Sequence, residues 1–84
     1  MTWIAVWSDT AKRQLKKFPK KDQKRILDKT DEVEQDPFRY LIRLSGEPFH
    51  RFRMGNYRII VNVVNDHLLL QIVKVKNRKN AYKK

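Results

Sequence analysis

In the first half of the chain, the hydrophobic pattern changes from that of a short strand to that of helices. Residues 3–7 are rich in aromatic and β-branched residues, which predicts a first strand. Ser8 is suited to cap a helix, and apolar side chains at Ala11, Leu15 and Phe18 then recur at the spacing of one buried helical face. The pattern therefore predicts a strand followed by a short helix.

A second helix is predicted from about residue 20 to about residue 35, after a proline that separates it from the first. Its charged residues are interpreted as a solvated face, with opposite charges four residues apart. Residues 37–48 follow as a connector whose apolar side chains indicate that it packs against the rest of the protein. The residues expected to form the buried stripe of the second helix are Ile26, Leu27, Thr30 and Val33.

The second half of the chain alternates polar and apolar residues as strands do, most clearly in a β-hairpin over residues 49–61. Gly55 and Asn56 supply a two-residue turn, and glycine at its first position suits a type II′ geometry. This turn pairs Met54 with Tyr57, Arg53 with Arg58, Phe52 with Ile59 and Arg51 with Ile60. One face then carries Phe52, Met54, Tyr57, Ile59 and Val61, and the other carries Arg51, Arg53 and Arg58.

A further strand is predicted over residues 67–75, after a turn at Asn65 and Asp66. The order of strand, two helices and three antiparallel strands indicates a two-layer α+β fold, with both helices on one face of an antiparallel-rich sheet. We expect residues 1–84 to form a single domain with a short basic tail. The expected pairs between the last two strands are Val63 with Leu68, Val61 with Leu70 and Ile59 with Ile72.

The charge of the chain is strongly positive and is concentrated in its second half. Lysine and arginine number 20 against 9 acids, which gives a formal net charge of +11. Asp66 is the only acid in residues 49–84, so this half is expected to bind a polyanion such as nucleic acid or an acidic protein. Within it, Lys74, Lys76 and Lys79 are expected to contact RNA.

Several classes of protein are disfavoured by what the sequence lacks. It contains no cysteine, and its early apolar run is too short for a signal-peptide core or a membrane span. We therefore expect a cytoplasmic protein without a membrane partner. The histidines and acids show no spacing typical of a metal site, and no glycine-rich phosphate loop is present, so no cofactor and no metal are expected.

The arginine face of the hairpin is a candidate functional site. Like charges directly opposite each other destabilise a sheet, and proteins tend to carry such unfavourable features where function requires them. Guanidinium groups bind phosphate in a bidentate manner and stay charged, which suits them to a phosphoryl group under in-line attack. In RNA the neighbouring 2′-hydroxyl can attack without a metal, leaving a 2′,3′-cyclic phosphate and a 5′-hydroxyl. Arg78 and Tyr82 are expected to join this site, Tyr82 by stacking on a base or by proton transfer. Composition and spacing predict equally well a basic surface that binds an anion without chemistry.

Taken in order and spacing, several short pieces of the chain resemble the RelE/ParE superfamily of toxins from toxin–antitoxin pairs. The resemblance spans nearly the whole chain and implies a RelE-like fold. The pieces are the first strand ending in Ser8 and Asp9, the helices separated by Pro19, Asp36-Pro37-Phe38, residues 44–48, residues 51–59, and Arg78 with Tyr82.

The resemblance implies a choice between two activities. RelE-like members cleave mRNA in the ribosomal A site without a metal, whereas ParE-like members inhibit DNA gyrase. The first activity is favoured here, because ParE-like members generally lack the complete basic set of the ribonuclease centre. The family also implies an acidic, RelB-like antitoxin as a partner, besides mRNA and the ribosome. The catalytic residues that the resemblance implies are Arg51, Arg53, Arg58, Arg78 and Tyr82.

The general base is not identified by the resemblance. Some ribonuclease members carry lysine where this chain has Arg51 and Arg53, and one such lysine is a candidate base. Arginine is effectively never deprotonated in proteins. Lys76, Tyr82 and His50 are alternatives, and charge stabilisation can also supply most of the rate. A basic RNA-binding or antitoxin-binding module with attenuated activity is a further interpretation.

Overall fold

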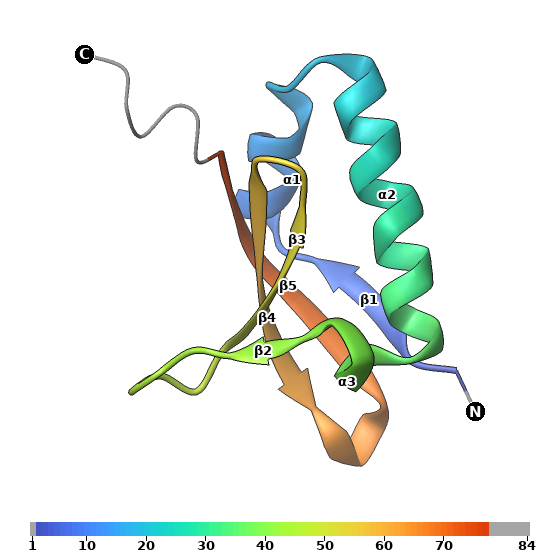
Figure 1. Cartoon of the computed structure of the whole chain (residues 1–84), viewed down its shortest axis with the longest axis vertical. Helices are drawn as coiled ribbons and strands as arrows, with labels where there is room; N and C mark the ends of the chain where they lie inside the picture. Colours follow the sequence, from blue (N-terminus) through green and yellow to red (C-terminus); the bar gives the residue numbers. More distant parts are fainter. Residues whose placement is uncertain (1, 78–84) are drawn as a thin grey trace.

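In residues 2–77, the part of the chain that the computed structural model describes, five strands form one mixed sheet with the longer helices against one face (Figure 1). The strand order is β1-β5-β4-β3-β2. β1 runs parallel to β5, and the other neighbours are antiparallel. The first strand is therefore an edge strand that pairs with the last. The strands are β1 (Ile4–Trp7), β2 (Ile42–Arg43), β3 (His50–Met54), β4 (Tyr57–Val64) and β5 (Leu69–Asn77).

The two long helices form where the pattern predicts them. α1 (Asp9–Lys16) begins after Ser8, whose Oγ accepts a hydrogen bond from the Ala11 N–H at 3.0 Å. α2 spans Lys20–Gln35 and follows the predicted proline. A short helix, α3 (Pro37–Tyr40), and the two-residue strand β2 occupy the segment that we expected only to be a packed connector. Among the described residues, no helix is long and apolar enough to cross a membrane.

The hydrophobic core lies between the helices and the sheet. Ile26, Thr30 and Val33 of α2 are buried as predicted, but the prediction for Leu27 was wrong, because this side chain is 43% exposed. Leu27 lies beside β1, where the sheet ends and no further strand covers it. The buried apolar residues of the core are Ala11, Leu15, Ile26, Val33, Leu41, Phe52, Tyr57, Ile59, Val61, Leu70, Ile72 and Val75.

Polar side chains of the helices bond directly to the sheet. Tyr57 donates its hydroxyl to Asp22 Oδ2 at 2.6 Å, and its ring packs on Phe18 with centroids 4.6 Å apart. Burial, and then the hydrogen bond to Asp22, raise the pKa of Tyr57 to about 12, so the hydroxyl stays a donor at neutral pH. Two helix side chains also accept hydrogen bonds from the backbone of the sheet. Gln14 Oε1 accepts one from the Val75 N–H at 2.7 Å, and Glu34 Oε2 accepts one from the Ala5 N–H at 2.6 Å.

The register of the β3–β4 hairpin is confirmed at every predicted pair. Met54 faces Tyr57, Arg53 faces Arg58, Phe52 faces Ile59 and Arg51 faces Ile60. Gly55 has a φ of +61°, and Asn56 does not share a positive φ, which fits the expected type II′ turn. The prediction succeeded because a two-residue turn leaves the two strands only one way to pair.

The register predicted between β4 and β5 was wrong by two or three residues. The connection is a 3₁₀ turn over Asn65–His67 followed by Leu68 in the left-handed region, with a φ of 50°, instead of a two-residue turn. The expected strand at residues 67–75 therefore begins later, at Leu69. A β-bulge opposite Ile60 and Val61 then leaves Val73 of β5 unmatched. The observed pairs are Val63 with Leu70, Val61 with Ile72 and Ile59 with Val75.

Candidate functional site

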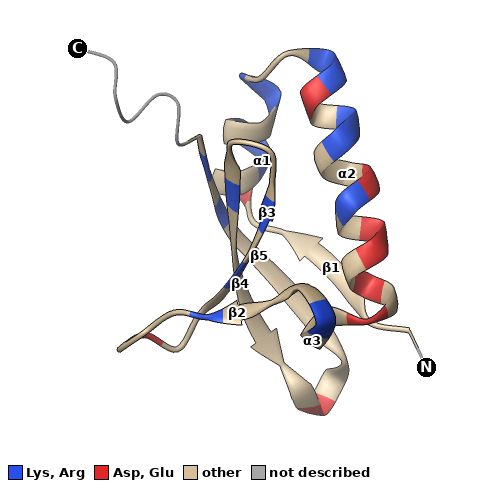
Figure 2. Ribbon diagram, viewed as in Figure 1, with Lys and Arg blue, Asp and Glu red and all other residues tan. Residues whose placement is uncertain are grey.

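Basic side chains stand in two rows across the face of the sheet that α1 and α2 leave open, which we call the outer face. In the first row Arg53 of β3 pairs with Arg58 of β4, and Arg58 pairs on its other side with Lys76 of β5. In the second row Arg51, Ile60 and Lys74 follow one another in the same way. Figure 2 shows these basic residues on neighbouring strands, and acids gathered along the C-terminal half of α2. The five predicted site residues on the strands therefore share one face.

The β-bulge in β5 is what brings the two lysines to the outer face. Before the bulge, Leu70 and Ile72 point toward the helices and are buried. After the unmatched Val73, the alternation is reversed, so Val75 is buried and Lys74 and Lys76 are exposed. Uninterrupted alternation from Leu70 would turn both lysines toward the apolar core.

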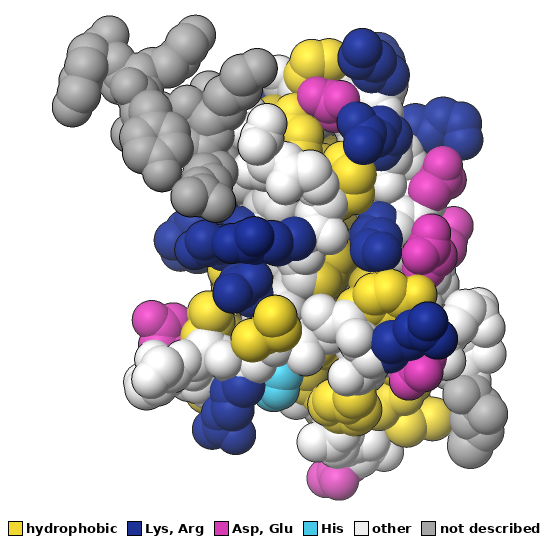
Figure 3. Space-filling view, viewed as in Figure 1, with side chains coloured by type: hydrophobic (Ala, Val, Ile, Leu, Met, Phe, Trp, Pro, Cys, Tyr) yellow, Lys and Arg dark blue, Asp and Glu magenta, His cyan; other side chains and the backbone are white. Residues whose placement is uncertain are grey.

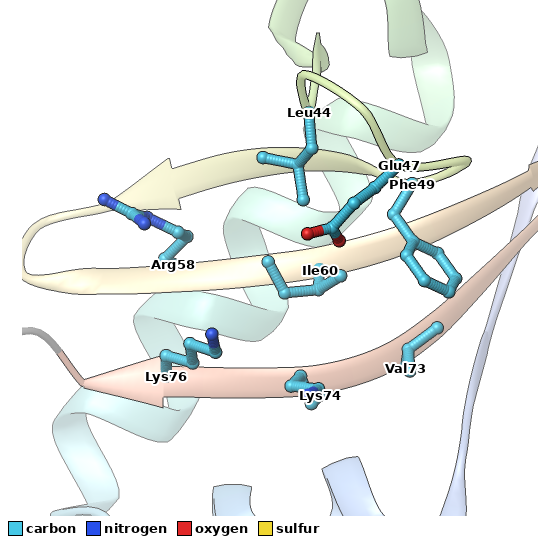
Figure 4. A pocket seen from close by; sticks show the side chains of 8 residues that line it. All are labelled: Leu44, Glu47, Phe49, Arg58, Ile60, Val73, Lys74 and Lys76. Atoms are coloured by element: carbon cyan, nitrogen blue, oxygen red, sulfur yellow. The ribbon is translucent and has the colours of Figure 1, made fainter.

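A pocket with a volume of about 200 Å³ lies on the outer face and combines cations with apolar side chains (Figure 4). Its cations are Arg58, Lys74 and Lys76. Leu44 and Glu47 reach it from the loop that connects β2 and β3. Such a lining suits a ligand with both a phosphate and an apolar ring. The remaining lining residues are Phe49, Ile60 and Val73.

The two arginines of β3 line a different pocket. Arg51 and Arg53 face a hollow of about 230 Å³, together with Lys29 and Arg39. Tyr40 also lines this hollow, and the Lys29 ammonium lies 4.4 Å from the centre of its ring. The structure therefore places the predicted cations in two neighbouring hollows, one on each side of β3.

The cations of the outer face act on one another electrostatically. Burial, and then the charges of Arg53 and Arg58, lower the pKa of Arg51. In residues 2–77, neither of the two ion pairs involves a cation of these rows; both pairs lie on α2. Figure 3 shows a band of dark-blue side chains over the β3–β4–β5 part of the sheet. The surface thus concentrates positive charge, and its cations form no ion pair with the described residues.

His50 lies on the opposite face of β3, toward the helices, as the alternation predicts. It pairs with Val61, and its ring contacts Phe38 edge-on with centroids 6.3 Å apart. Its Nδ1 is buried and has no hydrogen-bond partner among residues 2–77. Burial, and then the charge of Arg43, lower its pKa below the usual 6.5. Because the sheet separates His50 from the outer face, its position does not support the role of general base there.

Three predicted residues lie outside the described part of the chain, namely Arg78, Lys79 and Tyr82. Sequence reasoning missed three residues that the pocket contains, Leu44, Glu47 and Phe49. The available signal was the glycine turn at Gly46, which carries the residues around it back over β3 and β4. Among the described residues, no group of three or more histidines, aspartates and glutamates is placed to hold a metal ion.

Comparison with known families identifies the relatives of this chain. A family described as the ParE toxin of the type II toxin–antitoxin system parDE matches residues 5–82. The chain belongs to this toxin family. It is therefore a toxin of the RelE/ParE superfamily, as the resemblance implied. Among curated protein sequences, none matches it significantly.

Solved structures of RelE toxins share the fold of this RelE/ParE toxin. The toxin–antitoxin complex RelBE2 from Mycobacterium tuberculosis gives a TM-score of 0.82 at 21% identity, covering 92% of each chain. The RelE–RelB complex from Pyrococcus horikoshii gives 0.79 at 28% identity, over 93% of this chain and 97% of that one. The isolated E. coli RelE toxin gives a TM-score of 0.73 at 14% identity, covering 89% of this chain and 83% of that chain. These similarities confirm the predicted RelE-like α+β fold.

Proposed function

We propose that this RelE/ParE toxin is a metal-independent, ribosome-dependent endoribonuclease that cleaves mRNA in the A site and so inhibits translation. One observation carries the proposal: Arg53, Arg58 and Lys76 form a row of cations, without an ion pair in residues 2–77, beside a pocket on the open face of the sheet. Like charges placed side by side raise the free energy of the folded protein. Phosphate oxygens bound among them would remove this cost.

The chemistry assigned to this face is attack by the 2′-hydroxyl of one nucleotide on the phosphate that follows it. Arg58 and Lys76 hold the scissile phosphate and stabilise the charge that develops on its oxygens. Arg51 and Arg53 bind the adjoining backbone across β3. The sugar or base packs against Ile60 and Phe49. Arg78 and Tyr82 also belong to the proposed centre. Their assignment rests on the sequence, because they lie outside the described residues.

An acidic antitoxin is the second proposed partner. The structures similar to this chain include toxins in complex with RelB-type antitoxins. An acidic chain laid over the outer face would neutralise its rows of cations and exclude RNA from the same surface. The lysines of α1 and α2 lie on the other layer, where ribosomal RNA can reach them while mRNA occupies the outer face.

Inhibition of DNA gyrase without catalysis is the alternative. The family that matches residues 5–82 is the ParE family, and ParE-like members act in this way. A supercoiling assay with purified gyrase separates the two functions, because the ribonuclease leaves supercoiling unchanged. Inhibited supercoiling together with intact mRNA would replace the ribonuclease proposal by the gyrase one.

The direct test is induction of the wild type and of Arg58→Ala in cells, followed by primer extension on a translated mRNA. We expect cuts within codons for the wild type, and at least a ~100-fold weaker signal for the variant, since a charge-stabilising group is lost. Arg13→Ala removes an arginine from the exposed face of α1 and serves as the matched control. Thermal melting of Arg58→Ala should be unchanged or slightly higher, because a like-charge neighbour is removed. Growth arrest without cuts would contradict the proposal.

A further inference from the structure

Glu47 is the acidic residue that lines the basic pocket of the outer face. It lies in the turn between β2 and β3, which is closed by a backbone hydrogen bond from the Leu44 N–H to the Phe49 carbonyl at 2.9 Å. The Glu47 N–H bonds to the Leu44 carbonyl at 3.3 Å, and Gly46 takes a φ of +74°. This turn folds the loop over β4 and thereby places the Glu47 side chain at the pocket.

The Glu47 carboxylate points into the pocket. In Figure 4 its oxygens lie over Ile60, on the side that faces Arg58, while Lys76 extends its ammonium from the neighbouring strand. Within residues 2–77, Glu47 forms no ion pair, although three cations line the same pocket. The exposed carboxylate thus lies among cations without forming an ion pair with any of them in the described part of the chain.

No other acid of the described residues has this position. The glutamates and aspartates of α2 belong to the helix layer, behind the sheet. Asp66 lies in the 3₁₀ turn after β4, whereas Arg58 lies at the start of that strand, next to the hairpin turn. A proton acceptor for chemistry at the outer face is therefore available from Glu47.

We propose that Glu47 is the general base of the reaction on the outer face, an assignment that rests on the proposed ribonuclease function. The Glu47 carboxylate takes the proton of the 2′-hydroxyl, and the 2′-oxygen forms a bond to the adjacent phosphorus. The bond from phosphorus to the 5′-oxygen breaks, and that oxygen takes a proton from solvent. Glu47 then returns its proton to solvent. The products are the 2′,3′-cyclic phosphate and the 5′-hydroxyl, with no redox change.

A carboxylate suits this role better than the surrounding groups. Guanidinium groups do not lose a proton in proteins, so the arginines of the outer face cannot accept one. A lysine acts as a base only after its ordinary pKa of about 10.4 has been lowered by several units. A glutamate with an ordinary pKa of about 4.3 is already ionised at neutral pH. The cations then bind the phosphate, and Glu47 removes the proton of the 2′-hydroxyl.

The test compares Glu47→Gln with the wild type in single-turnover cleavage on purified ribosomes that hold mRNA in the A site. We expect the cleavage rate of the variant to fall by about 10²-fold to 10⁴-fold. Its affinity for an mRNA with a 2′-deoxy residue at the cleavage site should be equal or higher, because a negative charge has been removed beside the phosphate. Asp66→Asn makes the same charge change elsewhere and should cleave at the wild-type rate.

The pH dependence gives a readout that a purely structural role would not change. We expect the wild-type rate to be flat from about pH 6 to about pH 8, because removal of the proton by a side chain of the protein does not require hydroxide. The residual rate of Glu47→Gln should rise about tenfold per pH unit, because hydroxide must then remove the proton. Glu47→Ala should regain part of its rate when formate is added.

Each outcome decides the assignment. A Glu47→Gln variant that cleaves at the wild-type rate, or a wild-type rate that rises steadily over this pH range, overturns the role of Glu47 and leaves the ribonuclease function standing. A wild type that leaves the mRNA intact overturns both. Equal thermal melting of the wild type and Glu47→Gln shows that the loss of rate is not a loss of folding.

Discussion

At the scale of single residues, Arg58 has another cation on each side, Arg53 on β3 and Lys76 on β5. Such pairs weaken a sheet, and a bound phosphate would reverse the effect. The position of Arg53 opposite Arg58 follows from the two-residue turn at Gly55, so the sequence predicts it. Lys76 opposite Arg58 depends on a bulge further along β5, and alternation alone does not predict it.

His50 is expected to make the protein less stable in mildly acidic solution. Burial and the charge of Arg43 lower its pKa in the folded state below the usual 6.5. The unfolded chain therefore binds more protons at this residue than the folded chain does. Its contribution to stability falls as the pH drops through about 6.5 toward the lowered pKa. The free energy of unfolding in urea, measured at about pH 7.5 and about pH 5.5, gives the size of the loss.

Substitution separates His50 from the other titrating groups. His50→Leu should reduce the loss of stability between the two pH values, because no partly buried imidazole remains to be protonated. His67 is exposed on the turn before β5, so His67→Leu is the matched control and should leave the loss unchanged. The interpretation is wrong if His67→Leu reduces the loss of stability and His50→Leu leaves it unchanged.

At the scale of elements, the bulge in β5 depends on a contact with the start of α1. Ser8 Oγ donates to the carbonyl of Val73, the unmatched residue of the bulge, at 2.8 Å. The same oxygen accepts from the Ala11 N–H and so caps the helix. One hydroxyl thereby bonds to both the helix end and the backbone of the bulge.

Ser8→Ala should lower the free energy of unfolding by about 1–3 kcal/mol, because it removes the helix cap and the hydrogen bond to the Val73 carbonyl. Denaturant unfolding of the purified protein measures this difference. Thr10→Ala, two residues further on in an exposed position, is the control and should change stability by less than about 0.5 kcal/mol. Equal losses in both variants would show that Ser8 has no special role.

Elements set by neighbouring residues could be predicted, and elements set by distant contacts could not. The apolar spacing and the proline define the two long helices, and Gly55 with Asn56 defines the hairpin. α3 and β2 are too short to show a period. The pairing of β5 depends on the 3₁₀ turn and on Ser8, which lies 65 residues from Val73. The position of Glu47 could not be predicted either, because only the folded turn brings it over β4.

At the scale of the whole molecule, the acids are spread unevenly over the surface. The outer face of the sheet carries cations, whereas acids gather on the C-terminal half of α2 (Figure 2). Opposite charges that lie on different faces of a small protein give it a preferred orientation in the field of a polyanion. A short single-stranded RNA should therefore approach the outer face and avoid the C-terminal half of α2.

Binding of a short single-stranded RNA should weaken linearly with the logarithm of salt concentration. Each cation that contacts a phosphate contributes about 0.7 to this slope. Lys76→Ala should thus reduce the slope by about 0.7. Lys24 is paired with Asp28 at 3.1 Å on α2, so Lys24→Ala should leave the slope unchanged. Fluorescence anisotropy at several salt concentrations measures both, and equal slopes for wild type and Lys76→Ala would remove Lys76 from the contact surface.

The pairing of β1 with β5 also has a consequence for synthesis of the chain. β1 finds its neighbour only after β5 has been made, and the Ser8 bond to Val73 joins residues 65 apart. The outer face needs β5 as well, since Lys74 and Lys76 belong to it. A nascent chain therefore has no complete outer face while its last strand is still inside the ribosome. Under the proposed ribonuclease function, this order of synthesis would protect the ribosome that is making the protein.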